Sequence, residues 1–372
     1  MHVHARYLRG RSPPTGRIWS FAYRISLTDE ITVFHHWHII FVNWNLVPAT
    51  YNIRIIPARG MGIVTSTLAG ADGTILFECI SFPAYNFSMA DQSEIHTGIC
   101  EDIGLRRSME DEHAIYQNPE KGFFSAEVYD GHGGRSAAQV AAEMVTPYFL
   151  HEWSRESEKA LKDRTPEYEL LRNAYLAVDR HIVENGLDSG TTAAGIYLIH
   201  DHFFAANCGD TRIVIGTRHG VSTLTLDHKP DLPDELQRIE MNGGHVISVG
   251  VARVQGILAV SRAIGDRSLK PHVIAEPRIT EGYLGRDNDF IVIACDGVWD
   301  VLSPDIVIAI VRAAADVQAA AENIRTTAID SGSTDNITII VLGLKEYTAG
   351  FKRKKMEITT VVDRALPRAE RK

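Results

Sequence analysis

Short apolar runs separated by two or three turn residues are the feature that most constrains how this chain of 372 residues can fold. The interruptions between them are Asp-His, Gly-Asp and Arg-His-Gly. Runs of this length with turn residues at close intervals are typical of antiparallel strands, so they predict an antiparallel meander. The four runs are Ala194–Ile199, Phe203–Asn207, Arg212–Ile215 and Val221–Leu226.

Further strands and several helices are predicted around this meander. Phe290–Ala294 and Asn336–Leu342 are rich in Ile and Val, which favour strands. Apolar residues at three- and four-residue spacing predict helices over Ser136–Trp153 and Glu167–Asn185, and one long helix over Pro304–Thr327 after the N-cap Ser303. Strands and helices mixed in this way predict an α+β fold, in which two antiparallel sheets pack on each other with helices outside.

The chain divides into three regions of different character. Residues 1–92 have mixed composition and no chemical motif, which leaves open an accessory domain, a poorly ordered extension, or sequence upstream of a later start at Met61 or Met89. Residues 93–345 carry the regular pattern and are the predicted catalytic domain. Residues 346–372 are basic, with a run at Lys352–Lys355, and are predicted to be a solvated tail.

Composition limits the partners and the compartment. The formal net charge of −9 argues against nucleic-acid binding. The sequence contains no uninterrupted run of about 18 apolar residues, so we predict no membrane span. Four cysteines without a C-x-x-C spacing indicate buried free thiols in a reducing compartment. We therefore expect a monomeric cytoplasmic protein, while the basic tail leaves nuclear targeting open and the arginine-rich start leaves organellar targeting open.

Acidic residues recur at the ends of the predicted strands, each beside a glycine or a second acid. Two carboxylates about 4 Å apart repel by roughly 4 kcal/mol at an effective dielectric constant near 20, so a cluster of several needs cations. A single Asp-Gly pair is more often an ordinary turn, but five such groups in this order are hard to obtain as turns. The groups are Glu110-Asp111, Asp130-Gly131, Gly209-Asp210, Asp296-Gly297 with Asp300, and Asp335-Asn336.

Oxygen ligands of this kind favour Mg²⁺ or Mn²⁺ over zinc, for which these acids have no paired Cys or His nearby. The glycine after Asp130 lets a backbone carbonyl approach a cation closely. Two such ions can bridge one water, lower its pKa and stabilise an in-line attack on phosphorus. The sequence therefore predicts a two-metal hydrolytic centre.

Taken together, these motifs resemble those of the metal-dependent serine/threonine phosphatases of type 2C, the PPM family. The resemblance covers roughly residues 94–344. It is carried by Arg106–Asp111 (R-x-x-M-E-D), Tyr129–Gly134 (Y-D-G-H-G-G), Ser189–Ala193, Asn207–Arg212, Leu226–Pro230, Asn242–Gly244, Leu258–Ala263 with Gly265-Asp266, Asp296–Asp300 and Ser333–Asn336.

The resemblance implies hydrolysis of phosphoserine and phosphothreonine on phosphorylated proteins, at a centre of two Mn²⁺ or Mg²⁺ ions with a third, weaker ion. The metals would lie at one edge of the sandwich. Arg106 would bind the substrate phosphate, and His132 would be the general acid that protonates the leaving oxygen. In this resemblance Asp130 would bridge the two main ions, the Gly131 carbonyl would bind one of them, and Asp296 and Asp335 would bind the other. Glu110 and Asp111 would hold water molecules bound to the metals. Asp210 and Asp300 would help to bind the third ion.

The sequence departs from the family pattern in two places. Phe123–Tyr129 is two residues longer than the usual strand, which predicts a local bulge because two residues preserve the facing of a strand. The stretch from Asn242 to Val254 is short, which predicts a small flap beside the active site. The alternative function is a catalytically silent scaffold that keeps the fold, but such relatives lose metal aspartates that are present here.

Overall fold

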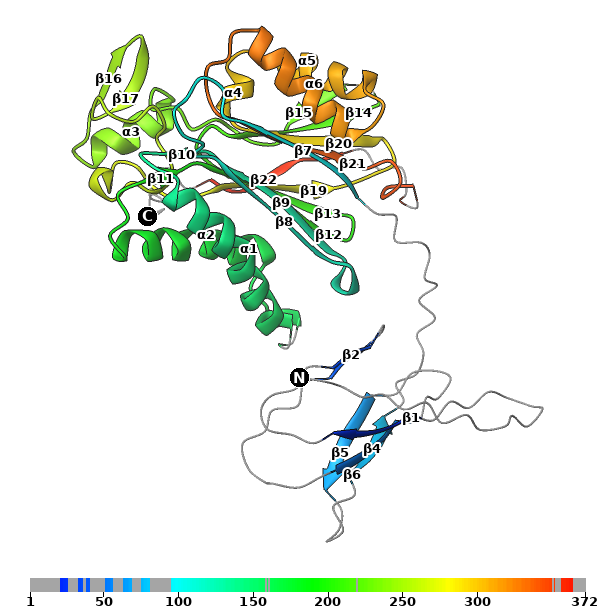
Figure 1. Ribbon diagram of the computed structural model, residues 1–372. Helices are drawn as coiled ribbons and strands as arrows, with labels where there is room; N and C mark the ends of the chain where they lie inside the picture. Colours follow the sequence, from blue (N-terminus) through cyan, green and yellow to red (C-terminus); the bar gives the residue numbers. More distant parts are fainter. Residues whose placement is uncertain are drawn as a thin grey trace. The chain divides into compact units, whose positions relative to one another are not determined.

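Figure 1 shows the computed structural model, which describes residues 95–157, 159, 161–218, 220–349, 351 and 356–363, together with short strands in the first 80 residues. The chain separates into two compact units, Met1–Ala90 and Asp91–Lys372. The first unit contains three antiparallel strand pairs. These are β1 (Phe21–Ile25) with β4 (Tyr51–Ile55), β2 (Val33–His35) with β3 (His38–Ile40), and β5 (Ile63–Leu68) with β6 (Ile75–Ile80).

Two large antiparallel sheets form the centre of the second unit. The six-stranded sheet has the order β22 (Thr359–Val362), β19 (Arg278–Tyr283), β13 (His202–Cys208), β12 (Ala193–Ile199), β9 (Phe123–Tyr129) and β8 (Glu112–Asn118). The five-stranded sheet has the order β15 (Gly220–Thr223), β14 (Arg212–Thr217), β20 (Asn288–Ala294), β21 (Ile337–Gly343) and β7 (His96–Asp102).

The helices lie on the outer faces of the two sheets (Figure 1). Two long helices cover the six-stranded sheet, and three shorter ones cover the five-stranded sheet. The first pair is α1 (Ser136–Ser157) and α2 (Glu167–Glu184); the second group is α4 (Asp296–Trp299), α5 (Pro304–Ala313) and α6 (Val317–Asp330).

Smaller elements complete the second unit. They are α3 (Pro233–Met241), the hairpin of β16 (Val246–Val249) and β17 (Val251–Val254), the 3₁₀ turns at Pro119–Lys121, Leu161–Asp163 and Arg267–Leu269, and a small sheet of β10 (Gly131–His132), β11 (Gly190–Thr191) and β18 (Ile264–Gly265).

Alternation along the strands explains the layers. In β9, Phe123 and Tyr129 pack towards α1 and α2, while Phe124, Ala126 and Val128 pack between the two sheets. Successive side chains of a strand point to opposite faces, so a strand buried on both faces must be apolar on both. The central strands have this pattern, and the predicted sandwich of two antiparallel sheets with flanking helices is confirmed.

Two local predictions about the strands were wrong. The four runs do not form one meander, because β13 pairs with β19 while β14 pairs with β20 in the other sheet. The chain crosses between sheets at Gly209, whose φ of 110° belongs to the region that glycine favours. The predicted bulge in Phe123–Tyr129 is absent, since β9 keeps a continuous register with both β8 and β12.

The long helix predicted over Pro304–Thr327 is two helices. Its start at Ser303 is confirmed, because the Ser303 hydroxyl accepts the Ile306 N–H. The break follows from Ala314, which is extended, and from Asp316, which caps the second helix by accepting the Ala319 N–H at 2.8 Å. An aspartate inside a helical apolar pattern therefore marked a new N-terminus.

The region after residue 345 is also more than a solvated tail. Thr359–Val362 forms strand β22 on the edge of the six-stranded sheet, and Val362 is buried. Asp363 then forms ion pairs with Arg262 and Arg278. The basic run Lys352–Lys355 lies outside the described residues.

Candidate metal centre and phosphate site

The candidate centre forms where strands of both sheets end. β9, β20 and β7 finish at this end, and β14 and β21 begin there, because neighbouring strands are antiparallel. The loops that follow or precede them carry the predicted acids. Residues far apart in the sequence therefore meet at one end of the sandwich.

Asp130 and Gly131 are fixed by the backbone of the small sheet. The Asp130 carbonyl accepts the Thr192 N–H at 2.8 Å, and Gly131 pairs with Thr191. A Cβ atom at Gly131 would lie 2.3 Å from the carbonyl oxygen of Glu110, so a side chain here would push the two segments apart. Glycine is thus required by close backbone approach.

Asp130 belongs to two groups of potential metal ligands among the described residues. One group joins it to Asp111 and Cys295, and the other joins it to Asp210 and Asp296. Within each group, one ligand atom from every residue lies within 4.8 Å of the others. Burial raises the pKa of the Cys295 thiol well above its usual value, so this neutral sulfur is a poor ligand for a hard cation.

The carboxylates of this cluster are destabilised as anions. Burial and repulsion from Asp296 hold the pKa of Asp130 well above its ordinary value. Burial and repulsion from Asp210 and Asp300 raise the pKa of Asp296 to about 8, and burial raises that of Asp111 to about 6. Bound cations would remove this repulsion, so the donor set fits divalent metals that prefer oxygen ligands.

Asp335 and Arg106 form the side of the site nearest solvent. Arg106 Nη2 lies 2.5 Å from Asp335 Oδ2, and the Arg106 side chain is 60% exposed. The loop that presents Arg106 bends at Gly104, where a Cβ atom would lie 2.1 Å from the Asp335 carbonyl oxygen. The predicted phosphate-binding arginine and a predicted metal ligand thus share one site.

Asn336 is a positioning residue to which the sequence motif gave no role. Its side-chain amide donates to the carbonyls of Ile103 and Ser108 at 2.9 and 3.1 Å, and its oxygen accepts the Glu110 N–H at 2.9 Å. These bonds tie the loop that carries Arg106 to the strand after Asp335. The Asp-Asn pair in the sequence was the available signal.

Glu110 and Asp111 differ in their surroundings. Glu110 accepts the Gly134 N–H at 2.9 Å and so links its loop to the glycine-rich turn after His132. Asp111 is buried and accepts the Thr338 hydroxyl at 2.8 Å. Asp111 belongs to the carboxylate cluster, whereas Glu110 is not in either of the two groups described above.

His132 has a carboxylate partner that the sequence left without a role. Its Nε2 lies 2.7 Å from Oδ2 of Asp266, and the Asp266 side chain is only 8% exposed. Gly190 makes room for this pair, since a Cβ there would lie 2.1 Å from the same Asp266 oxygen. The Gly265-Asp266 pair in the motif was the signal for it.

Asp210 and Asp300 lie on the flank towards Lys229. Lys229 forms an ion pair with the buried Asp210. Asp300 is exposed as a residue, but its carboxyl is partly desolvated, and this desolvation, countered by Lys229, raises its pKa. Asp210 is one of the clustered potential ligands. Asp300 is not in these groups, but its negative charge is close enough to raise the pKa of Asp296.

Comparison with known proteins decides the family. The profile of the family described as protein phosphatase 2C matches residues 95–337. The chain belongs to the protein phosphatase 2C family. The predicted family and its enzyme class, protein phosphatase, are thereby confirmed.

Two relatives from a plant illustrate the similarity. "Probable protein phosphatase 2C 59" of Arabidopsis thaliana is 33% identical over 276 residues, which cover 72% of this phosphatase and 86% of the relative. "Probable protein phosphatase 2C 69" of the same plant is 34% identical over 279 residues, covering 72% and 75% of the two chains.

Solved structures share the fold. A C. elegans sex determining protein superimposes with a TM-score of 0.60 and 27% identity, covering 68% of the phosphatase and 65% of that chain. Serine-threonine phosphatase 2C from Toxoplasma gondii gives a TM-score of 0.59 at 24% identity, covering 67% and 94%.

The cysteines and helices of the described residues bear on the compositional expectations. Cys208 and Cys295 are buried free thiols, as predicted, whereas Cys100 is a free thiol that is only half-buried. None of the described helices combines the length and apolar character needed to cross a bilayer.

Proposed function

We propose that this phosphatase hydrolyses phosphoserine and phosphothreonine on proteins with two divalent cations, Mn²⁺ or Mg²⁺, and a third, weaker ion. The observation that carries the proposal is the position of Asp130, whose carboxylate belongs to two separate ligand groups. A carboxylate shared in this way is suited to bridge two cations.

The chain offers distinct ligands for the two ions. Asp130 and the Gly131 carbonyl would hold one, and Asp130 with Asp296 and Asp335 would hold the other. Asp111 and Glu110 would act through water, and Asp210 and Asp300 would hold the third ion. When bound, the cations supply a water of lowered pKa and neutralise the phosphate.

Arg106 and His132 act on the substrate itself. The exposed guanidinium of Arg106 presents paired N–H donors that match two phosphate oxygens. Because Asp266 is the hydrogen-bond partner of Nε2 of His132, the other ring nitrogen, Nδ1, is the atom that can give a proton to the leaving oxygen. Asp266 would orient the ring and stabilise its charged form.

The need for such a proton favours aliphatic phosphate esters. The alkoxide that leaves from serine or threonine is a strong base and requires protonation as the P–O bond breaks. A scaffold without activity would need neither the His132–Asp266 pair nor the carboxylate cluster. Both are present, so the catalytic function is favoured over the scaffold.

The test is metal-dependent hydrolysis of a phosphothreonine peptide, with Asp130→Asn as the decisive variant. Activity should vanish in EDTA and return with Mn²⁺ or Mg²⁺ but little with Ca²⁺, whose coordination is longer and looser. Mn²⁺ should also raise the melting temperature of the wild type, because it binds the native state, and raise that of Asp130→Asn much less.

Asp163→Asn is the matched control, because Asp163 is exposed and lies outside the cluster. It should keep the wild-type activity and the wild-type thermal shift. Full activity after exhaustive chelation would refute the metal-dependent mechanism, and an unchanged thermal shift in Asp130→Asn would remove Asp130 from the site.

A further inference from the structure

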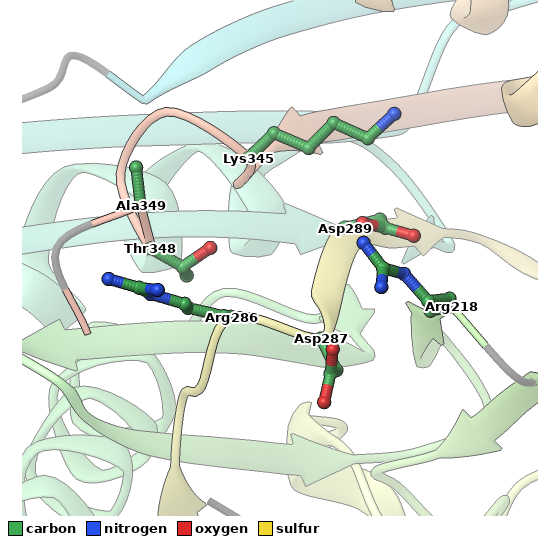
Figure 2. Close-up of a pocket in the computed structure, with 7 residues that line it drawn as sticks. All are labelled: Arg218, Arg286, Asp287, Asp289, Lys345, Thr348 and Ala349. Atoms are coloured by element: carbon green, nitrogen blue, oxygen red, sulfur yellow. The ribbon is translucent and has the colours of Figure 1, made fainter. Parts of the chain in front are cut away.

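A cavity of about 350 Å³ lies at the other end of the five-stranded sheet from the candidate centre (Figure 2). Its walls come from the segment after β14, the segment that leads into β20 with the start of that strand, and the segment after β21. The centre lies at the start of β14 and β21 and at the end of β20. These strands have six or seven residues, so roughly 20 Å of sheet separates the cavity from the centre.

Cationic side chains surround the cavity. Figure 2 shows Arg218, Arg286 and Lys345 around it, and all three are exposed. None of them forms an ion pair with a carboxylate among the residues that the structure describes; Lys345 instead lies over the ring of Phe290 at 5.3 Å. Arg218 and Arg286 thus line the cavity from two segments, with Lys345 at its edge (Figure 2), and none of the three is paired with a carboxylate among the described residues.

Two carboxylates, Asp287 and Asp289, also line the cavity. With three cations and two acids, the formal charge of its lining is +1. The site therefore offers guanidinium and ammonium donors together with carboxylate acceptors. A ligand that satisfies both must carry an anionic group and hydrogen-bond donors.

The three segments are held together by their backbones. The Arg218 N–H donates to the Asp287 carbonyl at 2.9 Å, and the Leu344 N–H donates to the Asp289 carbonyl at 2.9 Å. The buried Thr348 hydroxyl fastens the last segment by donating to the Leu344 carbonyl at 2.9 Å. The cavity is therefore formed before any ligand arrives, which reduces the entropic cost of binding.

We propose that this cavity is a binding site for a small phosphate monoester that carries hydroxyl groups, of the sugar phosphate type. The arginines would hold the phosphate, whose oxygens match the planar guanidinium, and the aspartates would accept hydrogen bonds from the hydroxyls. The volume lies at the lower end of the roughly 300–1,000 Å³ found for small-molecule sites. The same phosphate chemistry on a protein-borne phosphoserine is the competing source.

The test is calorimetric titration of the full chain with glucose 6-phosphate. The protein carries Arg106→Ala and is dialysed free of divalent cations, without a chelator, so that the active site neither holds nor hydrolyses the ligand. Glucose 6-phosphate should bind at one site, and glucose should not bind. A serine-phosphorylated peptide should bind at least tenfold more weakly than the sugar phosphate.

Charge reversal at the cavity assigns the site. Arg286→Glu should weaken glucose 6-phosphate binding at least tenfold, and Lys345→Glu, on a different segment, should weaken it in the same direction. Arg180→Glu is the matched control: it makes the same change of net charge at an exposed arginine on α2 and should leave the affinity within twofold of the parent.

Several outcomes would overturn the assignment. Absence of binding to the Arg106→Ala protein would confine phosphate to the active site. Equal weakening by Arg286→Glu and Arg180→Glu would reduce the effect to net charge. Tighter binding of the phosphopeptide than of the sugar phosphate would assign the cavity to a protein ligand. None of these results depends on metal-dependent catalysis, so they are separate from the test of the proposed function.

Discussion

Glu127 lies inside the core between the six-stranded sheet and helix α1, and its replacement by glutamine tests how this sheet tolerates a carboxyl group. It belongs to the face of β9 that also buries Phe123 and Tyr129. The Thr146 hydroxyl of α1 donates to Oε1 at 2.5 Å, whereas Oε2 has no hydrogen-bond partner among the described residues. A neutral carboxyl tolerates this environment far better than a carboxylate.

The expected size of the effect follows from the pKa. Burial, countered in part by Thr146, raises the pKa of Glu127 from an ordinary 4.5 to about 7. Between these pH values the folded protein keeps the proton while the unfolded chain loses it, so stability falls as pH rises from 4.5 to 7 and is constant above. Each pKa unit corresponds to about 1.4 kcal/mol, which gives a loss of roughly 3 kcal/mol.

Glu127→Gln keeps the shape and removes the titration. At pH 4.5 the variant and the wild type should unfold at nearly the same temperature, because both side chains are neutral there. At pH 8 the variant should be more stable by roughly 3 kcal/mol, which corresponds to about 6–12 °C for a domain of this size. Thermal unfolding followed by circular dichroism, in cation-free buffers from pH 4.5 to 8.5, measures the difference.

Glu120→Gln is the control, since Glu120 is exposed on the 3₁₀ turn before β9. It should show the wild-type pH dependence. Comparison of each variant with the wild type at the same pH also cancels the titration of the carboxylate cluster at the metal centre. A stability difference between Glu127→Gln and the wild type that is the same at every pH would refute the reasoning.

Two further predictions concern the substrate. Arg106→Ala should raise the inhibition constant of free phosphate at least tenfold, because one pair of phosphate contacts is lost. Arg107→Ala, at the exposed neighbouring residue, should leave this constant unchanged. Equal inhibition constants for Arg106→Ala and the wild type in inhibition kinetics would remove Arg106 from the phosphate site. His132→Gln should slow hydrolysis of a phosphothreonine peptide by about 10²–10⁴-fold, but slow hydrolysis of para-nitrophenyl phosphate much less, since nitrophenolate leaves without a proton. Asp266→Asn should show the same difference between the substrates with a smaller loss of activity. Equal loss of activity on both substrates, together with weaker Mn²⁺ binding in the kinetic assays, would show that His132 has a structural role.

The strands show how far local sequence patterns determine the fold. Phe290–Ala294 was predicted from its Ile and Val content, and it lies within β20. The pairing of β13 and β14 was not predicted correctly, because an apolar run contacts its sequence neighbour either through hydrogen bonds in one sheet or through side chains between two sheets. Both arrangements place the same residues in the core.

The site shows the same division. The clustered acids and their glycines were legible in the sequence, because both oxygen ligands and close backbone approach require particular residue types at particular positions. The pairing of His132 with Asp266 and the triple contact of Asn336 were not legible. They join residues more than 100 positions apart, and no local pattern encodes such a contact.

By itself, the sequence determined the types of element, the family and the residues able to bind cations, since periodicity, turn residues and ligand chemistry are local properties. Only the tertiary structure decided that Asp130 is shared between two groups of potential metal ligands and that residues after 345 supply an edge strand. It also decided that Arg218, Arg286 and Lys345, none of them paired with a carboxylate among the described residues, line a cavity at the far end of the sheet. These features depend on which strand ends come together, and that depends on pairing and packing across the whole sandwich.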